Sequence, residues 1–416
     1  MQKKITNICL FLTPACVFAF PGSYWLGALM FSSIGIWMIA RRQVGISDAI
    51  AALREIPMMW GFLIYVVLYI SLCIYHEEAA KDFGNVLPFL LSPLIFIAVS
   101  RNEPNPRNFW FGCATGALVA FSIGIAQIYF FNYERASGFR NPILFGDTAI
   151  VLGTGALVGL FYGRSFAEDF WSRVYLFVCG LAGLATSLLS GSKGGWLSLL
   201  MIIVLLANVA TRSMHIVKRL AFVFSCLLVL VAFIALTPKL PVVHRLVSAY
   251  HGTVEWFETG RVTEGSASLR LEAFKAGLIA GAQNPVLGGG KQRELVAFQD
   301  AFDAGLIRKE MIELNVVDND FISVFSRQGL VGVFSVIAIY VAAFLTFWRY
   351  RREPDDTLKA LSSMGMFFVL LYLEFGLTVS IFSTTIFRTM YVTWAILLAA
   401  LIFSERRRVS SGSQVA

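Results

Sequence analysis

The sequence predicts an all-α protein that crosses a membrane many times, and three observations support this fold class. The chain of 416 residues is 57% hydrophobic, with a mean hydropathy of +0.71. Only 14% of its residues are charged, against roughly 25% in soluble domains. Apolar runs long enough to cross a bilayer as helices recur from one end of the chain to the other. Because these runs are continuous and not alternating, they do not fit a transmembrane β-barrel.

Twelve segments are expected to cross the membrane as helices, and the first is expected to be retained. It follows Lys3 and Lys4 as a signal peptide would, but no cleavage site with small residues precedes a soluble domain. The basic tail after the last helix, residues 405–416, is expected to be disordered. The expected spans are 5–21, 24–40, 59–75, 86–100, 109–131, 143–162, 174–190, 195–211, 220–237, 321–347, 360–381 and 389–404.

Basic residues alternate between the connections, and this alternation predicts the orientation of the chain. Every second connection is rich in Lys and Arg, and the positive-inside rule places these connections and both termini in the cytoplasm. The net charge of +8 therefore does not indicate a nucleic-acid partner. The cytoplasmic set contains Lys3, Lys4, Arg41, Arg42, Arg101, Arg107, Arg164, Arg173, Arg212, Lys218, Arg219, Arg349, Arg351, Arg352, Arg406, Arg407 and Arg408.

One connection, residues 238–320, is long enough to fold outside the membrane, and it divides the chain. Residues 1–237 hold the first nine expected helices, and residues 321–404 hold the last three. Within the connection, "SASLRLEAFKAGLIAGAQ" is expected to be a helix. "NPVLGGG" ends that helix, and "KQRELVAFQDAFDAGLIRKEMIEL" is expected to be a second, amphipathic helix. Such a helix lies on the membrane surface or caps a cavity between spans.

Basic residues also lie on the side that the positive-inside rule leaves poor in Lys and Arg, and five of them are candidate site residues. Cations that converge on one exterior site would suit an anionic lipid head group, above all a phosphate or pyrophosphate. The alternative is that each one is a solvated surface charge, since the rule is a statistical bias. The five residues are Arg135, Arg140, Lys193, Arg270 and Arg388.

Carboxylates stand where the chain enters apolar surroundings. Asp318, Asn319 and Asp320 precede the tenth expected span in "VVDNDFISVFSRQG". Asp318 or Asn319 could cap this helix by accepting hydrogen bonds from its free N–H groups, and a cap can also present a carboxylate to a cavity. Glu374 lies inside the eleventh expected span, where a carboxylate is costly and marks a functional site unless it pairs with a neighbouring Arg.

Metal, nucleotide and disulfide chemistry are not expected, and neither is a cofactor. The six cysteines fall in or beside apolar runs without metal-ligand spacing. "GGGK" at 288–291 fails the phosphate-loop pattern, because Pro285 stands where a Gly is needed and Gln292 where a Ser or Thr is needed. His244 and His251 have no partners at ligand spacing.

Several motifs, taken in their order along the chain, resemble the O-antigen ligase family and its relatives, the polymerases of the Wzy type. They are "RASGFRNPILFG", "SGSKGGWL", "SLRLEAFKAGLI" with "NPVLGGG", and "DNDFISVFSRQGLVGVFS". The resemblance covers residues 130–340 by motif and the whole chain by topology. It implies an inverting, metal-independent glycosyltransferase of the GT-C type at the periplasmic face of the bacterial inner membrane.

The resemblance also implies the substrates. The donor would be a glycan on undecaprenyl pyrophosphate, in contact with membrane lipids. The acceptor of a ligase would be a sugar hydroxyl of the lipid A–core oligosaccharide, and that of a polymerase would be another lipid-linked glycan.

Family residues carry over one by one. Arg270 matches an arginine on the loop helix that would bind the pyrophosphate. Lys193 stands where the family usually has an arginine, so the charge is kept but the bidentate fork is lost. Asp318 stands where the family usually has a histidine that is thought to assist the acceptor hydroxyl. Asp318 is therefore the candidate base or acceptor-orienting group, with Asn319 and Asp320 positioning it or capping the tenth span. Arg135, Arg140 and Arg388 would complete the pyrophosphate site.

Two other classes of function remain open at this point. A transporter or flippase for a lipid-linked solute would also cross the membrane many times, but matched repeats and paired broken helices are absent from the sequence. A structural scaffold leaves the exterior cations unexplained. Ligase and polymerase differ in the acceptor, and the two-helix layout of the long connection is more typical of the ligase.

Overall fold

The computed structural model describes residues 2–45, 54–139, 141–162, 169–210, 242–262, 266–314 and 316–412, with scattered positions between 47 and 50 and between 215 and 232. In these residues the chain is helical and forms no strand. The elements are α1 (Gln2–Ala15), η1 (Ser23–Trp25), α2 (Leu26–Ala40), α4 (Pro57–Tyr75), η2 (Ala80–Val86), α5 (Leu87–Asn102), α6 (Arg107–Ile125), η3 (Ala126–Phe130), α7 (Pro142–Tyr162), α8 (Phe170–Ser190), α9 (Lys193–Ala210), α11 (Val242–Thr259), α12 (Ser266–Gln283), α13 (Gly290–Asp303), α14 (Lys309–Leu314), α15 (Asp320–Trp348), α16 (Asp356–Phe375) and α17 (Thr385–Gly412).

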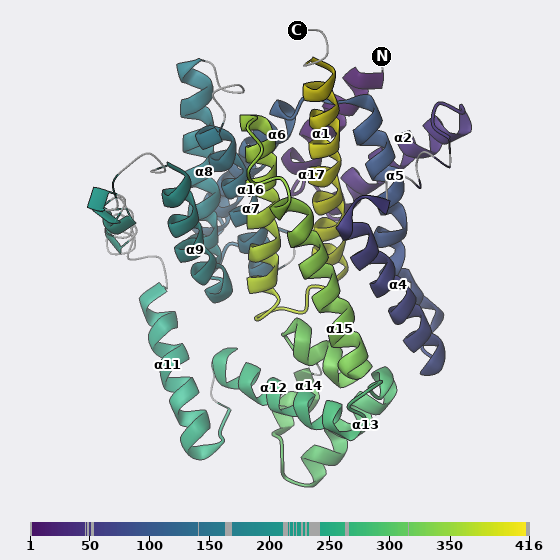
Figure 1. Cartoon of the computed structure of the whole chain (residues 1–416). Coiled ribbons are helices and arrows are strands. Elements are labelled where there is room, and N and C mark those ends of the chain that lie inside the picture. The colour runs from purple at the N-terminus through teal and green to yellow at the C-terminus, as the bar shows by residue number, and fades with distance from the viewer. Residues whose placement is uncertain are drawn as a thin grey trace.

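The helices form an elongated bundle with two different ends. Figure 1 shows both chain termini at one end, which we call the terminal end, and α11–α14 gathered at the other, which we call the loop end. This arrangement matches the expectation that the termini and the long connection lie on opposite sides of a membrane. Which end faces the cytoplasm stays a prediction from the charge pattern.

Nine helices among the described residues are long and apolar enough to cross a membrane. They correspond to nine of the twelve expected spans: Ser23–Ala40, Pro57–Tyr75, Ala80–Asn102, Arg107–Phe130, Pro142–Tyr162, Phe170–Ser190, Asp320–Trp348, Asp356–Phe375 and Thr385–Ser410.

The other three expected spans are not confirmed. The first segment forms α1, but this helix ends at Ala15 after 14 residues and contains Pro14. The eighth segment forms α9, whose apolar stretch is shorter, at Gly194–Ile203. Most of the ninth segment, 220–237, lies outside the described residues.

Glycines let the helices near the centre of the bundle approach closely. A Cβ on Gly153 of α7 would stand 2.7 Å from the carbonyl oxygen of Gly180 on α8, and one on Gly183 would stand 2.7 Å from that of Ala149. Small residues at such crossings allow backbone contact that larger side chains would prevent. The pair α7 and α8 therefore forms a rigid support for the turn between α8 and α9.

The described part of the long connection folds into four helices, where two were expected. α12 coincides with the first expected helix, Ser266–Gln283. The second expected helix, over 291–314, is wrong as a single element, because α13 ends at Asp303 and α14 begins at Lys309. Gly305 between them has a φ of 69°, which a continuing helix does not allow. The amphipathic α11 was not anticipated.

The helices α12–α14, which we call the loop domain, share a small hydrophobic core. Its members are the buried residues Ala273, Ala276, Ala280, Ala297, Phe298, Ala301, Ile307, Met311 and Val317. Most are alanines, so the helices pack closely, while Leu278 and Leu306 are about half exposed.

A break in α15 attaches the loop domain to the bundle. Gly329 has φ 62° and ψ −159° inside this helix. The N–H groups that the break frees are satisfied by the loop domain, since Leu330 donates to the carbonyl of Pro285 at 2.8 Å and Val331 to that of Val286 at 3.1 Å. The motif "NPVLGGG" therefore does more than end a helix, because its backbone pairs with the broken helix.

The basic tail differs from the expectation of disorder. α17 continues through Gly412, and residues 413–416 lie outside the described part. Glu405 is bonded to Arg408 one turn later, and Arg406 reaches Glu353 at 3.8 Å and lies over the ring of Tyr350. These contacts within and beside the helix stabilise its last turns.

Candidate functional site

Five elements meet at the loop end and bring together residues far apart in the sequence. The start of α7 supplies Asp147, the turn into α9 supplies Ser192, and the end of α16 supplies Glu374. α12 supplies Arg270, and Asp318 lies two residues before α15. We call these five residues the carboxylate site.

Arg270 and Asp318 lie within electrostatic range of each other. Burial raises the pKa of Asp318 above the ordinary value for aspartate, and the positive charge of Arg270 opposes that rise. The charge of Arg270 also acts on Asp147. Within the described residues no carboxylate forms an ion pair with Arg270 at 4.0 Å or less. Its guanidinium is therefore close to the carboxylates and still free to bind a ligand.

Asp147 and Glu374 are buried carboxylates that each keep one oxygen without a partner. Oδ1 of Asp147 accepts from the hydroxyl of Ser192 at 3.2 Å, and Oε2 of Glu374 accepts from the hydroxyl of Ser198. Oδ2 of Asp147 and Oε1 of Glu374 have no hydrogen-bond partner in the described part of the chain. Buried acceptors without partners are costly, so they indicate a site that is completed by a ligand, water or a further side chain.

The turn from α8 into α9 is fitted closely between these carboxylates. A Cβ on Gly195 would stand 3.0 Å from Oδ1 of Asp147, and one on Gly194 would stand 2.5 Å from the hydroxyl of Thr378. Lys193 lies in this turn as the first residue of α9. The close packing fixes the backbone at Lys193, but its side chain is not among those described, so its expected role stays a prediction.

Asn319 and Asp320 hold the backbone beside Asp318. Oδ1 of Asn319 accepts from the N–H groups of Phe321 and Ile322 at 2.9 and 3.0 Å, and so Asn319 is the N-cap of α15. Asp320 is fully buried and accepts from the hydroxyl of Tyr340 and from the N–H of Phe382, both at 3.0 Å. Capping by Asn319, one of the two expected alternatives, is thereby confirmed.

The other expected cations bind backbone carbonyls or lie outside the described residues. Arg135 donates from Nε to the carbonyl of Ser190 at 2.9 Å and from Nη2 to that of Gly191 at 3.3 Å, so it closes the end of α8. Arg140 lies outside the described residues. Arg388 is 2% exposed and binds the carbonyl of Phe382 and Oδ1 of Asn85.

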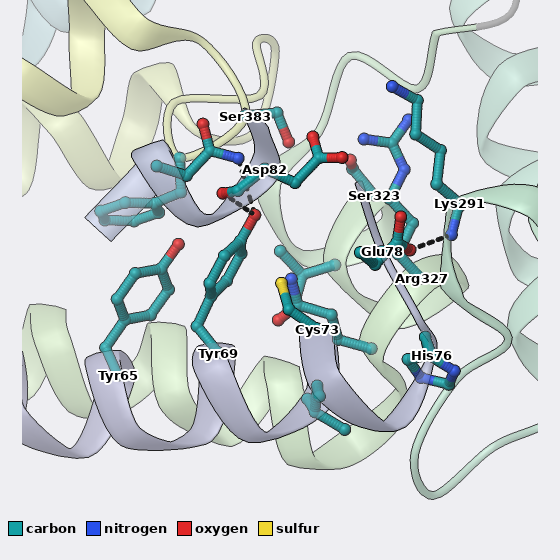
Figure 2. Close-up of a pocket in the computed structure, with 15 residues that line it drawn as sticks. Tyr65, Tyr69, Cys73, His76, Glu78, Asp82, Lys291, Ser323, Arg327 and Ser383 are labelled. Carbon is teal, nitrogen blue, oxygen red and sulfur yellow. Dashed lines mark hydrogen bonds between the residues drawn. The ribbon is translucent and has the colours of Figure 1, made fainter. Parts of the chain in front are cut away.

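Arg388 lies behind a second feature at the loop end, which we call the polar pocket. This pocket has a volume of about 190 Å³ between α4, η2, the start of α13, the first turns of α15 and the connection before α17. Figure 2 shows Tyr65 and Tyr69 on one side of it and Lys291 and Arg327 on the other. Its lining consists of Tyr65, Tyr69, Leu72, Cys73, His76, Glu78, Asp82, Asn85, Lys291, Ser323, Val324, Arg327, Gln328, Phe382 and Ser383.

Sequence reasoning missed Asp147 and most of the polar pocket. A signal for Asp147 was available, because it is a carboxylate inside an expected span, as Glu374 is. The pocket gave a weaker signal: Glu78 and Asp82 look like solvated charges of a short loop, and Lys291 belongs to the rejected phosphate-loop pattern "GGGK". The described residues contain no group of three or more His, Cys, Asp or Glu arranged for a metal ion.

Comparisons with known proteins show which part of the chain is similar to a known family. A family model described as O-antigen ligase matches residues 175–337, which is less than half of the chain but contains Lys193, Arg270 and Asp318. An uncharacterized protein of Haemophilus influenzae is 20% identical over 373 residues, which span 88% of this chain and 91% of that protein. Residues 175–337 are therefore similar to the domain that defines the O-antigen ligase family, and this similarity supports a ligase or polymerase role in O-antigen synthesis.

Proposed function

We propose that the protein is an O-antigen ligase, which transfers a glycan from undecaprenyl pyrophosphate to a sugar hydroxyl of the lipid A–core oligosaccharide. The observation that carries this proposal is that Arg270 and Asp318 lie within electrostatic range of each other at the loop end. Arg270 offers a cation to the departing pyrophosphate, and Asp318 offers a carboxylate to the acceptor hydroxyl. Both belong to the segment that matches the family model.

The reaction would be an inverting displacement. The oxygen of the acceptor hydroxyl forms a bond to the anomeric carbon, while the bond from that carbon to the pyrophosphate oxygen breaks. The hydroxyl proton passes to the Asp318 carboxylate, and the bonding electrons leave with undecaprenyl pyrophosphate. The transition state resembles an oxocarbenium ion, which makes the attacking hydroxyl acidic enough for a carboxylate to accept its proton late.

Cations already in place would lower the barrier to departure of the pyrophosphate. Arg270 is the cation whose position supports this role best, since it has no direct ion pair among the described residues. Lys193 would add a second positive charge from the turn that packs against Asp147. We propose no metal or cofactor in this reaction. Its site is placed at the periplasmic face of the inner membrane, on the sidedness predicted from the charge pattern.

Substitution in a ligase-deleted Gram-negative host with a matching lipid A–core tests the proposal. Wild type should restore the long-chain ladder of lipopolysaccharide on a gel. Asp318→Ala and Arg270→Ala should abolish it, and Asp318→His, which restores the usual family residue, should keep part of it. Asp300→Ala and Lys275→Ala are matched controls, because both side chains are exposed.

The same experiment separates the alternatives. If wild type lengthens the undecaprenyl-linked glycan and leaves lipid A bare, the protein is a polymerase. If neither product forms, the glycosyltransferase proposal fails and transport of a lipid-linked solute becomes the next function to assay.

A further inference from the structure

We propose that the polar pocket is a subsite for one uncharged sugar unit of a glycan substrate. The inference rests on the proposed function, because it names part of the substrate of that reaction. It concerns a place in the fold other than the carboxylate site. The carboxylate site is built from α7, α9, α12 and α16 with the start of α15, whereas the pocket is built from α4, η2, α13 and α15.

The size of the pocket limits what it can hold. Its volume of about 190 Å³ is below the roughly 300–1,000 Å³ of pockets that enclose drug-sized ligands. The space therefore fits a single sugar ring better than an oligosaccharide or a lipid-linked pyrophosphate. The rest of a glycan would extend out of the pocket mouth.

The charges around the pocket do not favour a phosphate. Glu78 and Asp82 place two carboxylates in the lining, against the cations of Lys291 and Arg327. Arg327 is already paired, since its Nε lies 2.6 Å from the buried carboxylate of Glu294. A pyrophosphate needs a clear excess of positive charge, which these groups do not provide.

Two polar side chains of the pocket have no partner among the residues described and could therefore form hydrogen bonds with the hydroxyl groups of an uncharged sugar. In the described part of the chain, neither the Asp82 carboxylate nor the Lys291 amine has a hydrogen bond or an ion pair. A carboxylate accepts from sugar hydroxyls, and an ammonium group donates to them. Figure 2 shows Asp82 between Tyr69 and the side that carries Lys291 and Arg327, so acceptors and donors face one enclosed space.

Aromatic side chains form the opposite wall and are fixed in position. Tyr65 and Tyr69 line the pocket with their ring centroids 5.5 Å apart, and aromatic rings offer an apolar partner to sugar C–H groups. The Tyr69 hydroxyl accepts from Nδ2 of Asn85 at 2.6 Å, and Oδ1 of Asn85 accepts from Arg388 at 2.7 Å. Arg388 therefore acts here as a positioning residue, which holds Tyr69 through Asn85.

The pocket is connected to the carboxylate site through shared backbone. Ser323 lines the pocket one turn after Asn319, the residue that follows Asp318. Phe382 and Ser383 also line it, and the N–H of Phe382 is bonded to Asp320. A glycan held in the pocket would thus lie against the same first turn of α15 that presents Asp318, which suits a unit next to the reacting sugar.

Binding measurements on the full-length protein in lipid nanodiscs test the subsite. The probes are the methyl glycosides of glucose, galactose and N-acetylglucosamine, observed by saturation-transfer difference NMR, and inorganic pyrophosphate, observed by phosphorus NMR. At least one glycoside should bind saturably, and Asp82→Asn and Lys291→Met should each weaken that binding roughly tenfold or more, as expected for the loss of one hydrogen bond to a charged group.

The controls are chosen to match these substitutions. Glu77→Gln and Lys81→Met change exposed residues of the same loop that do not line the pocket, and they should leave binding unchanged. Arg270→Ala should reduce pyrophosphate binding and leave glycoside binding intact. Thermal unfolding of each variant shows whether it is folded. Because Asp82 and Lys291 lie on different elements, one of the two variants still tests the subsite if the other does not fold.

Three results would overturn the subsite: no glycoside binds, both pocket variants bind like wild type, or pyrophosphate displaces the glycoside and is itself lost in Lys291→Met. Failure of the proposed function looks different. In that case wild type transfers no glycan to lipid A, while glycoside binding and its loss in Asp82→Asn are still observed.

Discussion

Asp318 combines partial burial with a nearby cation, and this combination predicts the pH dependence of transfer. Burial raises the pKa of Asp318, and Arg270 lowers it. Only the ionised carboxylate accepts a proton, so activity should fall as pH decreases through a value above the roughly 3.9 of an unperturbed aspartate. The acid limb of kcat/KM, measured with purified protein and a lipid-linked donor, reports this pKa.

Two variants sharpen this prediction. Asp318→His should move the acid limb toward the ordinary histidine pKa of about 6.5. Arg270→Gln removes the charge that favours the carboxylate, so its residual activity should show an acid limb at higher pH than wild type. An acid limb that is identical in all three proteins would show that Asp318 is not the base.

Asp320 has a different role from Asp318, although only one residue separates them. Asp320→Ala removes the acceptor for the hydroxyl of Tyr340 and for the N–H of Phe382, both buried. Each unsatisfied buried donor costs roughly 1–3 kcal/mol, so the Tm should fall by several degrees in a thermal unfolding assay. Asp318→Ala should abolish transfer with little change in Tm. If Asp318→Ala lowered the Tm and Asp320→Ala abolished transfer at an unchanged Tm, Asp320 would be the base and Asp318 the structural residue.

At the scale of the elements, the break in α15 at Gly329 explains the close packing of this helix against the motif "NPVLGGG". Gly329→Ala would place a Cβ 2.4 Å from the carbonyl oxygen of Val286, at a backbone conformation of φ 62° and ψ −159° that is almost restricted to glycine. The strain should be relieved by separation of α15 from the loop domain, which would lose the two backbone hydrogen bonds to Pro285 and Val286.

Limited proteolysis measures this separation. Residues 266–314 should be cleaved faster in Gly329→Ala than in wild type, and the Tm should fall, since strain of this kind costs roughly 1–3 kcal/mol. Gly84→Ala is the matched control, because a Cβ there meets nothing within 4 Å. Equal cleavage of the two variants would mean that the break does not attach the loop domain.

The sequence predicts elements well where hydrophobicity determines them and poorly where local geometry does. The span expected at 321–347 is observed as Asp320–Trp348, and that expected at 143–162 as Pro142–Tyr162. The end of α13 depends on a left-handed glycine, and the extension of α17 depends on pairs such as Glu405 with Arg408. Such effects are small compared with burial of a whole apolar helix, so a periodicity pattern does not reveal them.

At the scale of the molecule, sequence reasoning identified part of the site but not its neighbours. Arg270 and Asp318 could be selected because a family pattern marks both ends of the loop domain. The juxtaposition of Asp147, Ser192 and Glu374 depends on the packing of α7, α9 and α16. The polar pocket joins Asp82 to Lys291, more than two hundred positions later. Contacts at such separations follow from the tertiary fold, which no local signal encodes.

The opposite positions of the termini and the loop domain make the membrane orientation testable on the whole chain. Ala304 is exposed in the turn between α13 and α14 at the loop end, and Arg352 is exposed in the connection between α15 and α16. Four native cysteines, Cys9, Cys73, Cys113 and Cys179, are buried, while Cys16 is partly exposed, so the unsubstituted protein sets the background of labelling. With a membrane-impermeant maleimide applied to spheroplasts, Ala304→Cys should be labelled above the unsubstituted protein, and Arg352→Cys only after the membrane is opened. Because a lipid A–core acceptor is reached from the periplasm in the proposed reaction, labelling of Arg352→Cys alone in closed spheroplasts would reverse the orientation and exclude the ligase reaction.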